Sequence, residues 1–316
     1  MSAECLCGQL IGNLRSPNCP PQIGKIKRVN FQSLYQDDGT ANYIDTTATL
    51  NAAFWNALQY NTDTSIRIYP LPEDMEEVDT PKEESVFKVY ASGRKVKIRQ
   101  GARNFTSTLP VVAAALVDKI NSRGCSKQGV YFHTTKGILG WRKEAGALYP
   151  IPLSQDSLDA VLGLENETDP QRIMLVMQWA NNVVDGQLAI IPYSEIDGID
   201  MQTEFLGKMD TNIEQVAAAR SATTFSVDIS TDYGDAISRQ PVTGLVTADF
   251  TLYNDTDSTS ETLTSATEST TVPGRYAFVI STSETVTDLL TLGLSSTDAA
   301  KPFAYDSWDD VSIALQ

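Results

Sequence analysis

The chain is poor in the residues that most often carry catalytic or metal chemistry. It has 316 residues but only one histidine, His133. A serine–histidine–aspartate triad would have to use it, and its place in the apolar stretch 130–133 favours a structural histidine in a strand. Glycine-rich phosphate-binding loops and the common hydrolase and metalloprotease motifs are also absent. The sequence therefore predicts neither a catalytic site nor a cofactor.

Cysteine is scarce as well, and the four residues are Cys5, Cys7, Cys19 and Cys125. The first three could supply thiolates to zinc, with Cys125 or His133 as the fourth ligand. Structural zinc sites usually take their ligands as two closely spaced pairs, and the second pair is absent here. Free thiols in a reducing compartment are the favoured interpretation, and no metal site is predicted.

Long hydrophobic runs are missing. The longest strongly apolar runs, residues 111–117 and 173–177, are far shorter than the ~20 residues of a membrane span. The first residues show neither the basic region nor the apolar core of a secretory signal. We therefore expect no membrane insertion and no secretion through such a signal.

Basic residues become rare after Arg220, where the composition changes. The last 96 residues hold 3 basic and 14 acidic side chains, 32 serines and threonines, and no cysteine, histidine or methionine. Such a break predicts two domains. The expected division is an N-terminal arm over residues 1–30, an assembly domain over 31–220 and a β-sandwich over 221–316.

The net charge of −16 opposes wrapping of nucleic acid, which requires lysine and arginine to neutralise phosphates. If the protein lined a channel, an acidic channel wall would instead let DNA slide past without binding it tightly. Solubility alone also explains an acidic surface, so both interpretations stay open.

Apolar spacing predicts helices near 48–60 and from Pro110 to Gly124, the second being a core helix that lies across a sheet. A capping-box pattern at Thr211 and Glu214 predicts a short helix up to Ala219. Extended segments are expected at 66–71, 86–90, 96–99, 131–133, 138–141, 173–179 and 188–191, and a turn at Ser92 and Gly93 is expected to join 86–90 and 96–99 into a hairpin. The first domain is therefore expected to be mainly β with one core helix.

Beyond Arg220, apolar residues alternate at positions 225–229, 246–252, 276–280 and 311–315. Short alternating strands between turns rich in Thr, Ser, Asp and Gly predict an Ig-like β-sandwich of about 95 residues. The sandwich would have no disulfide, because the domain has no cysteine.

Charge is unevenly distributed between residues 72 and 103. A proline-bounded acidic stretch, expected to be a long exposed loop, is followed by a basic strand. Either the two form weak surface pairs within one hairpin, or the acidic loop of one subunit meets the basic strand of a neighbour. The candidate interface residues are Glu73, Asp74, Glu76, Glu77, Glu83, Glu84, Arg94, Lys95, Lys97, Arg99 and Arg103.

The same region resembles the major tail (tail tube) proteins of long-tailed bacteriophages. The resemblance rests on residues 70–74, PLPED, on 84–86, ESV, and on 92–105, SGRKVKIRQGARNF. It also rests on the order of elements, in which a loop-bearing strand pair precedes a core helix and further strands. A C-terminal Ig-like module is common in such proteins.

The resemblance implies a virion structural protein that is not an enzyme and assembles in the host cytoplasm. It implies hexameric rings stacked into a tube through which duplex DNA passes, with the Ig-like module displayed outside. Partners would be further copies of the chain, other tail proteins and, through the Ig-like module, host-surface glycans. The alternatives are a head decoration or fibre protein and a surface carbohydrate-binding adhesin.

Overall fold

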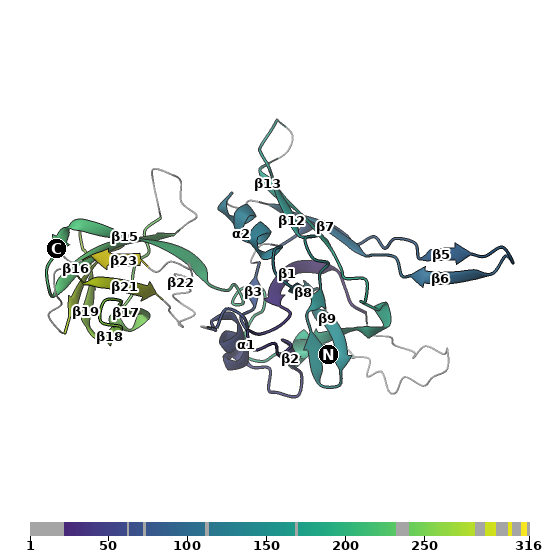
Figure 1. The fold of residues 1–316 in the computed structure, drawn as a ribbon, viewed down its shortest axis with the longest axis horizontal. Helices are drawn as coiled ribbons and strands as arrows, with labels where there is room; N and C mark the ends of the chain where they lie inside the picture. Colours follow the sequence, from purple (N-terminus) through teal and green to yellow (C-terminus); the bar gives the residue numbers. More distant parts are fainter. Residues whose placement is uncertain are drawn as a thin grey trace. The chain divides into compact units, whose positions relative to one another are not determined.

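The computed structural model describes residues 22–61, 63–71, 74–110, 114–167, 170–231, 240–281, 288–294, 303–304 and 311–314. The fold is mainly β with helices, as predicted (Figure 1). The chain divides into two compact units. The first comprises residues 1–52, 73–112 and 120–198, and the second comprises 53–72, 113–119 and 199–316.

The first unit is built on a large antiparallel sheet. Its strands adjoin in the order β2 (Ile44–Asp45), β10 (Ala147–Tyr149), β9 (Gly137–Glu144), β8 (Gln128–Thr134) and β1 (Ile26–Ser33). Two further strands, β11 (Ile151–Pro152) and β14 (Leu188–Pro192), pair with β8 and β9. Every residue of β8 is buried, so this strand is covered on both faces. The strands predicted at 131–133, 138–141 and 188–191 are confirmed.

A second sheet in the same unit has the order β12 (Asp159–Gly163), β13 (Arg172–Gln178), β7 (Asn104–Pro110) and β4 (Glu76–Asp79). The predicted strand 173–179 is confirmed as β13. Phe105 on β7 packs against Phe132 of the large sheet with ring centroids 5.0 Å apart, so the two sheets share one core.

Two α-helices lie in the described residues: α1 (Ala52–Gln59) and α2 (Ala115–Arg123). Both were predicted, although each is shorter than its apolar pattern. Trp55 of α1 is fully buried and meets Phe205 edge-on at 5.6 Å. Pro110 is the last residue of β7 rather than the first turn of a helix, and it lies opposite Arg172.

Short elements complete this part of the chain. They are β3 (Tyr69–Pro70) and the 3-10 turns η1 (Asp185–Gln187) and η2 (Tyr193–Glu195). The extended segment predicted at 66–71 is reduced to β3, because residues 64–66 form a turn.

The expected arm over residues 1–30 is wrong in its last part. Residues 1–21 lie outside the described residues, but β1 starts at Ile26 and pairs with β8 along its length. Val29 and Phe31 are buried in the core of the first unit.

The end of the second unit is a two-sheet β-sandwich, as predicted. One sheet has the order β19 (Leu263–Glu268), β20 (Arg275–Ile280), β16 (Thr224–Thr231), β15 (Met209–Arg220) and β22 (Phe303–Ala304). The other has the order β18 (Thr259–Glu261), β17 (Phe250–Asn254), β21 (Leu289–Leu294) and β23 (Val311–Ala314). Buried residues of both sheets form one core cluster, in which Phe278 stacks on Phe225 at 4.9 Å.

Two predictions near this sandwich are wrong. The helix expected at residues 211–219 is strand β15, which pairs with β16 and buries Ile213 opposite Ile229. A capping box is a local pattern, and here burial of an alternating apolar face outweighs it. Because β15 belongs to the sandwich, the sandwich begins before Arg220. The strand predicted over 246–252 is also absent at its start, because residues 247–249 form the 3-10 turn η3 (Thr247–Asp249).

Candidate subunit interface

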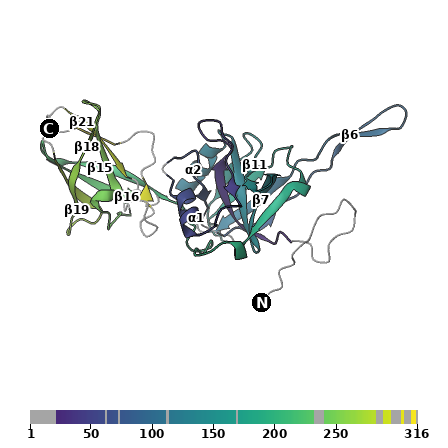
Figure 2. The same cartoon turned by 90° about the horizontal axis from the view of Figure 1, so that it is seen from below.

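The predicted hairpin is present as β5 (Val86–Val89) and β6 (Lys95–Arg99). Among the described strands, these two pair only with each other and form a sheet of two. Their turn is closed by hydrogen bonds from the Tyr90 amide to the Arg94 carbonyl and from the Gly93 amide to the Tyr90 carbonyl. Figures 1 and 2 show the hairpin projecting beyond the end of β7.

Apolar side chains of the hairpin are exposed on both of its faces. Phe87 is 54% exposed, Val89 59% and Ile98 62%. The alternation of Val96 and Ile98 with Lys97 and Arg99 is typical of a half-buried strand, but the hairpin has no buried face. A two-stranded hairpin is marginally stable alone in water, so this one presents a surface suited to being covered.

Charge on the hairpin has one sign. Residues 86–99 contain five basic side chains and no acidic one. Lys88 lies over the ring of Tyr90 at 5.2 Å. Within the described residues, Arg94, Lys95, Lys97 and Arg99 form no ion pair with a carboxylate of their own chain.

The base of the hairpin is held by a compact polar cluster. Asp185 of η1 pairs with Lys82 at 2.6 Å and with Arg103 at 3.2 Å. The Arg103 guanidinium also lies 5.2 Å from the Trp179 ring centroid and donates to the Thr80 carbonyl. Burial opposes the charge of Asp185, but the hydrogen bonds and charges of Lys82 and Arg103 outweigh it and lower the pKa of this carboxyl. Arg103 therefore anchors the base and does not lie on the projecting ribbon.

Backbone pairing continues from the second sheet into the hairpin. The Asn104 amide donates to the Pro81 carbonyl at 2.9 Å, and the Glu83 amide donates to the Ala102 carbonyl at 2.8 Å. The hairpin is thus an extension of the β4–β7 strand pair, so it points away from the sheet that carries it.

The acidic residues do not form the loop that was expected. Residues 76–79 form strand β4, which pairs with β7 in the second sheet. Asp74 pairs with Arg28 at 2.7 Å and with Lys27 at 3.7 Å. Glu77 accepts a hydrogen bond from the Thr108 hydroxyl.

The remaining acidic candidates divide by position. Glu76 lies on β4, Glu83 and Glu84 are exposed near the base of the hairpin, and Glu73 lies outside the described residues. No described contact joins these carboxylates to the basic side chains of the hairpin. The hypothesis of pairing within one hairpin therefore has no contact among the described residues in its favour.

The second sheet carries an apolar exposed face that the sequence pattern did not predict. Residues 173–177 read as one continuous apolar run, which is typical of a strand buried on both faces. In the structure Ile173, Leu175 and Met177 are buried, whereas Met174 is 49% exposed and Val176 36%. The polar residue Thr106 on β7, directly opposite Val176, is the signal that this face is not core, whereas Thr108, opposite Met174, is buried and donates its hydroxyl to Glu77.

His133 is a buried structural residue, as expected. Its Nε2 lies 2.6 Å from Asn30 Nδ2, and its Nδ1 lies 3.2 Å from the Tyr193 hydroxyl. Burial, reinforced by the charge of Arg28, lowers the pKa of His133 to about 3. The side chain is therefore neutral at physiological pH.

The described residues show no metal centre. They contain no group of three histidine, cysteine, aspartate or glutamate side chains that could hold an ion. Cys125 is exposed and free, and Cys5, Cys7 and Cys19 lie outside the described residues. None of the helices within the described ranges is long and apolar enough to cross a membrane.

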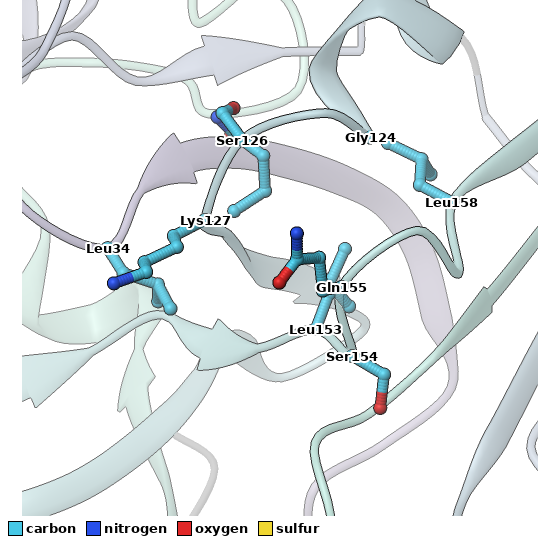
Figure 3. Close-up of a pocket in the computed structure, with 9 residues that line it drawn as sticks. Leu34, Gly124, Ser126, Lys127, Leu153, Ser154, Gln155 and Leu158 are labelled. Carbon is cyan, nitrogen blue, oxygen red and sulfur yellow. The ribbon is translucent and has the colours of Figure 1, made fainter.

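Two hollows of different size lie in the described part of the first unit. One, of about 50 Å³, is lined by side chains such as Leu34, Lys127, Gln155 and Leu158 (Figure 3). It is much smaller than the ~300–1,000 Å³ of usual ligand pockets. A second hollow of about 340 Å³ has Glu195 as its single ionisable lining residue.

Comparison with known proteins adds no assignment. No family model, curated protein or solved structure matches this chain.

Proposed function

We propose that this chain is a structural protein that assembles with copies of itself through the β5–β6 hairpin. The observation that carries the proposal is the combination of exposed apolar side chains and unpaired basic charge on one projecting ribbon. Protein surfaces seldom expose such a patch unless it is an interaction site.

The charge of the chain favours a second copy as the partner. Outside residues 86–99 the chain holds 19 basic and 40 acidic side chains, a balance of −21. A basic ribbon on an otherwise acidic protein is attracted to further copies of that protein, and opposite charges also set the orientation of docking. A contact between two different patches generates rings where the rotation closes and filaments where it does not.

The more specific proposal is a tail tube protein of a long-tailed bacteriophage. It rests on the resemblance carried by residues 70–105. It also rests on the presence, in one chain, of a β-rich assembly region followed by a C-terminal β-sandwich. The resemblance implies stacked hexameric rings in the virion tail, with duplex DNA passing through the tube and the sandwich outside. Other tail proteins, and host-surface glycans at the sandwich, are the further partners it implies.

Assembly can be tested with the charge-reversal variant Lys97→Glu with Arg99→Glu. Both side chains are exposed on β6, so the substitutions spare the core. We expect the unmodified chain to form rings or tubes by negative-stain microscopy and the variant to elute as a monomer with unchanged circular dichroism.

Other results would redirect the proposal. A small oligomer of fixed size favours a decoration or fibre protein. Unchanged assembly of the variant across a salt series would contradict a role for the hairpin. A chain that stays monomeric at every concentration tested would contradict self-assembly altogether.

A further inference from the structure

The second sheet of the first unit carries a face that matches the hairpin. Strand register defines two rows across this face: Glu76, Thr108, Met174 and Val161 in one, and Asp79, Thr106, Val176 and Asp159 in the other. Directly opposed residues in antiparallel strands point to the same side, so each row lies on one face. We call these eight residues the outer face.

The outer face is apolar at its centre and acidic at both edges. Met174 and Val161 lie directly opposite each other and are each 49% exposed. Carboxylates flank them, from Glu76 and Asp79 on β4 and from Asp159 on β12. Arg172, the first residue of β13, is a basic side chain in the register position next to the Met174 row.

One side of the hairpin has the complementary pattern. Phe87 lies opposite Lys97, and Val89 lies opposite Lys95, so these four side chains share one side of the ribbon. Two apolar groups are therefore flanked along one edge by two ammonium groups. Apolar centres can meet while the ammonium groups face the carboxylates at the edge of the outer face.

A hairpin cannot cover the outer face of its own chain. It continues the β4–β7 pair outward from this very sheet, and Figure 1 shows it leading away from β7 and β13. Reaching back would require the paired backbone at residues 81–104 to reverse direction. The partner that can bring a basic apolar ribbon to this face is a second copy of the chain.

We infer that the hairpin of one copy docks on the outer face of the next. This inference rests on the proposed self-assembly and specifies the surface that receives the hairpin. The contact joins two different patches, so each chain can dock its hairpin on one neighbour and receive the hairpin of another neighbour on its own outer face. Such a contact propagates from copy to copy and does not stop at a symmetric dimer.

A mixing experiment with two full-length variants tests this directly. Phe87→Glu blocks the hairpin and leaves the outer face intact. Met174→Glu blocks the outer face and leaves the hairpin intact. Each substitution puts a carboxylate in an exposed apolar centre among existing charges, and Val246→Glu in the sandwich, also 49% exposed, is the matched control.

We expect each variant alone to be monomeric by analytical ultracentrifugation, with the concentration for half-assembly raised at least about tenfold, while the control assembles normally. Mixed in equal amounts, the two variants should form a one-to-one dimer and nothing larger. In that dimer the intact hairpin of the Met174→Glu chain occupies the intact face of the Phe87→Glu chain.

The outcomes separate the two proposals. If Phe87→Glu abolishes assembly but Met174→Glu does not, the hairpin docks elsewhere and only this inference fails. If neither variant changes assembly, or the unmodified chain never assembles, the proposed function fails with it. A variant whose melting temperature falls well below that of the control is replaced by Val89→Glu or Val161→Glu, which alter the same two patches at exposed positions.

Discussion

Gly101 and Glu83 approach each other so closely at the base of the hairpin that a Cβ on Gly101 would lie 1.8 Å from the Glu83 carbonyl oxygen. The next nearest atoms, the Glu83 carbonyl carbon and the Glu84 carbonyl oxygen, also belong to the backbone. Backbone atoms cannot rotate away as a side chain can. Lack of space therefore requires glycine here, and the direction of the hairpin depends on this contact.

Replacing Gly101 with alanine should force the two strands apart at the base. Overpacking of this kind costs about 1–3 kcal/mol, and the free energy of unfolding should fall by a similar amount in chemical denaturation. Because the hairpin would also leave its present direction, assembly should weaken more than the fold.

Gly186→Ala is the matched control, since nothing lies within 4 Å of a Cβ at that position. Equal stability and equal assembly of the two alanine variants would show that the hairpin tolerates a change in direction.

A second prediction concerns pH. His133 titrates near pH 6.5 in the unfolded chain, but in the folded protein burial lowers its pKa to about 3. Between these two pKa values the imidazole therefore binds a proton in the unfolded state but not in the folded state. Stability from this residue is complete above pH 6.5 and is lost as the pH falls toward 3, by up to about 1.4 kcal/mol per pH unit.

The interval from pH 6.5 to 5 isolates this effect, because the chain has one histidine and ordinary carboxyl groups titrate lower. Unfolding free energies measured at pH 7.0 and 5.5 should differ more in the unmodified chain than in His133→Gln. Glutamine can still hydrogen-bond Asn30 but cannot titrate. Identical pH slopes for the two proteins would mean that His133 is accessible to protons in the folded state.

Sequence patterns anticipated those parts of the fold in which one face is buried. Tyr276, Phe278 and Ile280 alternate with exposed residues along β20, so periodicity alone located the strand. The same rule failed at β13, where Met174 and Val176 are apolar and yet exposed. Periodicity reports polarity, and it does not report whether another element covers a face.

The candidate interface was predictable only in part. A glycine-containing turn between two alternating segments was sufficient to predict the hairpin. Whether a third strand or a core covers the hairpin depends on pairing between distant segments. The acidic stretch also misled, because Glu76 to Asp79 form an edge strand on β7 through a contact about 30 residues away in sequence. Local composition carries no information on such pairing.

A third prediction places the end of the assembling part of the chain before β15, within the second unit. Phe205 packs on Trp55, and the Gly207 amide donates to Gln59 Oε1 at 3.0 Å, so residues up to 207 belong with α1. Strand β15 instead pairs with β16 and buries Ile213. A chain of residues 1–208 should therefore be soluble, folded by circular dichroism and able to assemble.

A chain of residues 1–220 is the informative comparison, because it keeps β15 without β16. Its exposed strand edge and Ile213 should promote aggregation, measured by light scattering at matched concentration. Superior solubility of the 1–220 chain would place the boundary at Arg220.

The last prediction concerns duplex DNA. If the hairpin is buried between copies, Lys95 and Lys97 face carboxylates of the outer face and are not available to phosphates. Assembled protein, at −16 per chain, should then show no tight binding to duplex DNA at physiological salt, measured by fluorescence anisotropy. The Met174→Glu monomer, whose hairpin is free, should bind weakly at low salt. The slope of log K against log salt should be no steeper than about −4.5, the value for five phosphate contacts. Adding Lys95→Glu and Lys97→Glu to that monomer should abolish the binding and so assign it to the hairpin. Tight, salt-dependent binding by the assembled protein would contradict both a buried hairpin and passage of DNA without anchoring, and would make the hairpin a nucleic-acid contact instead.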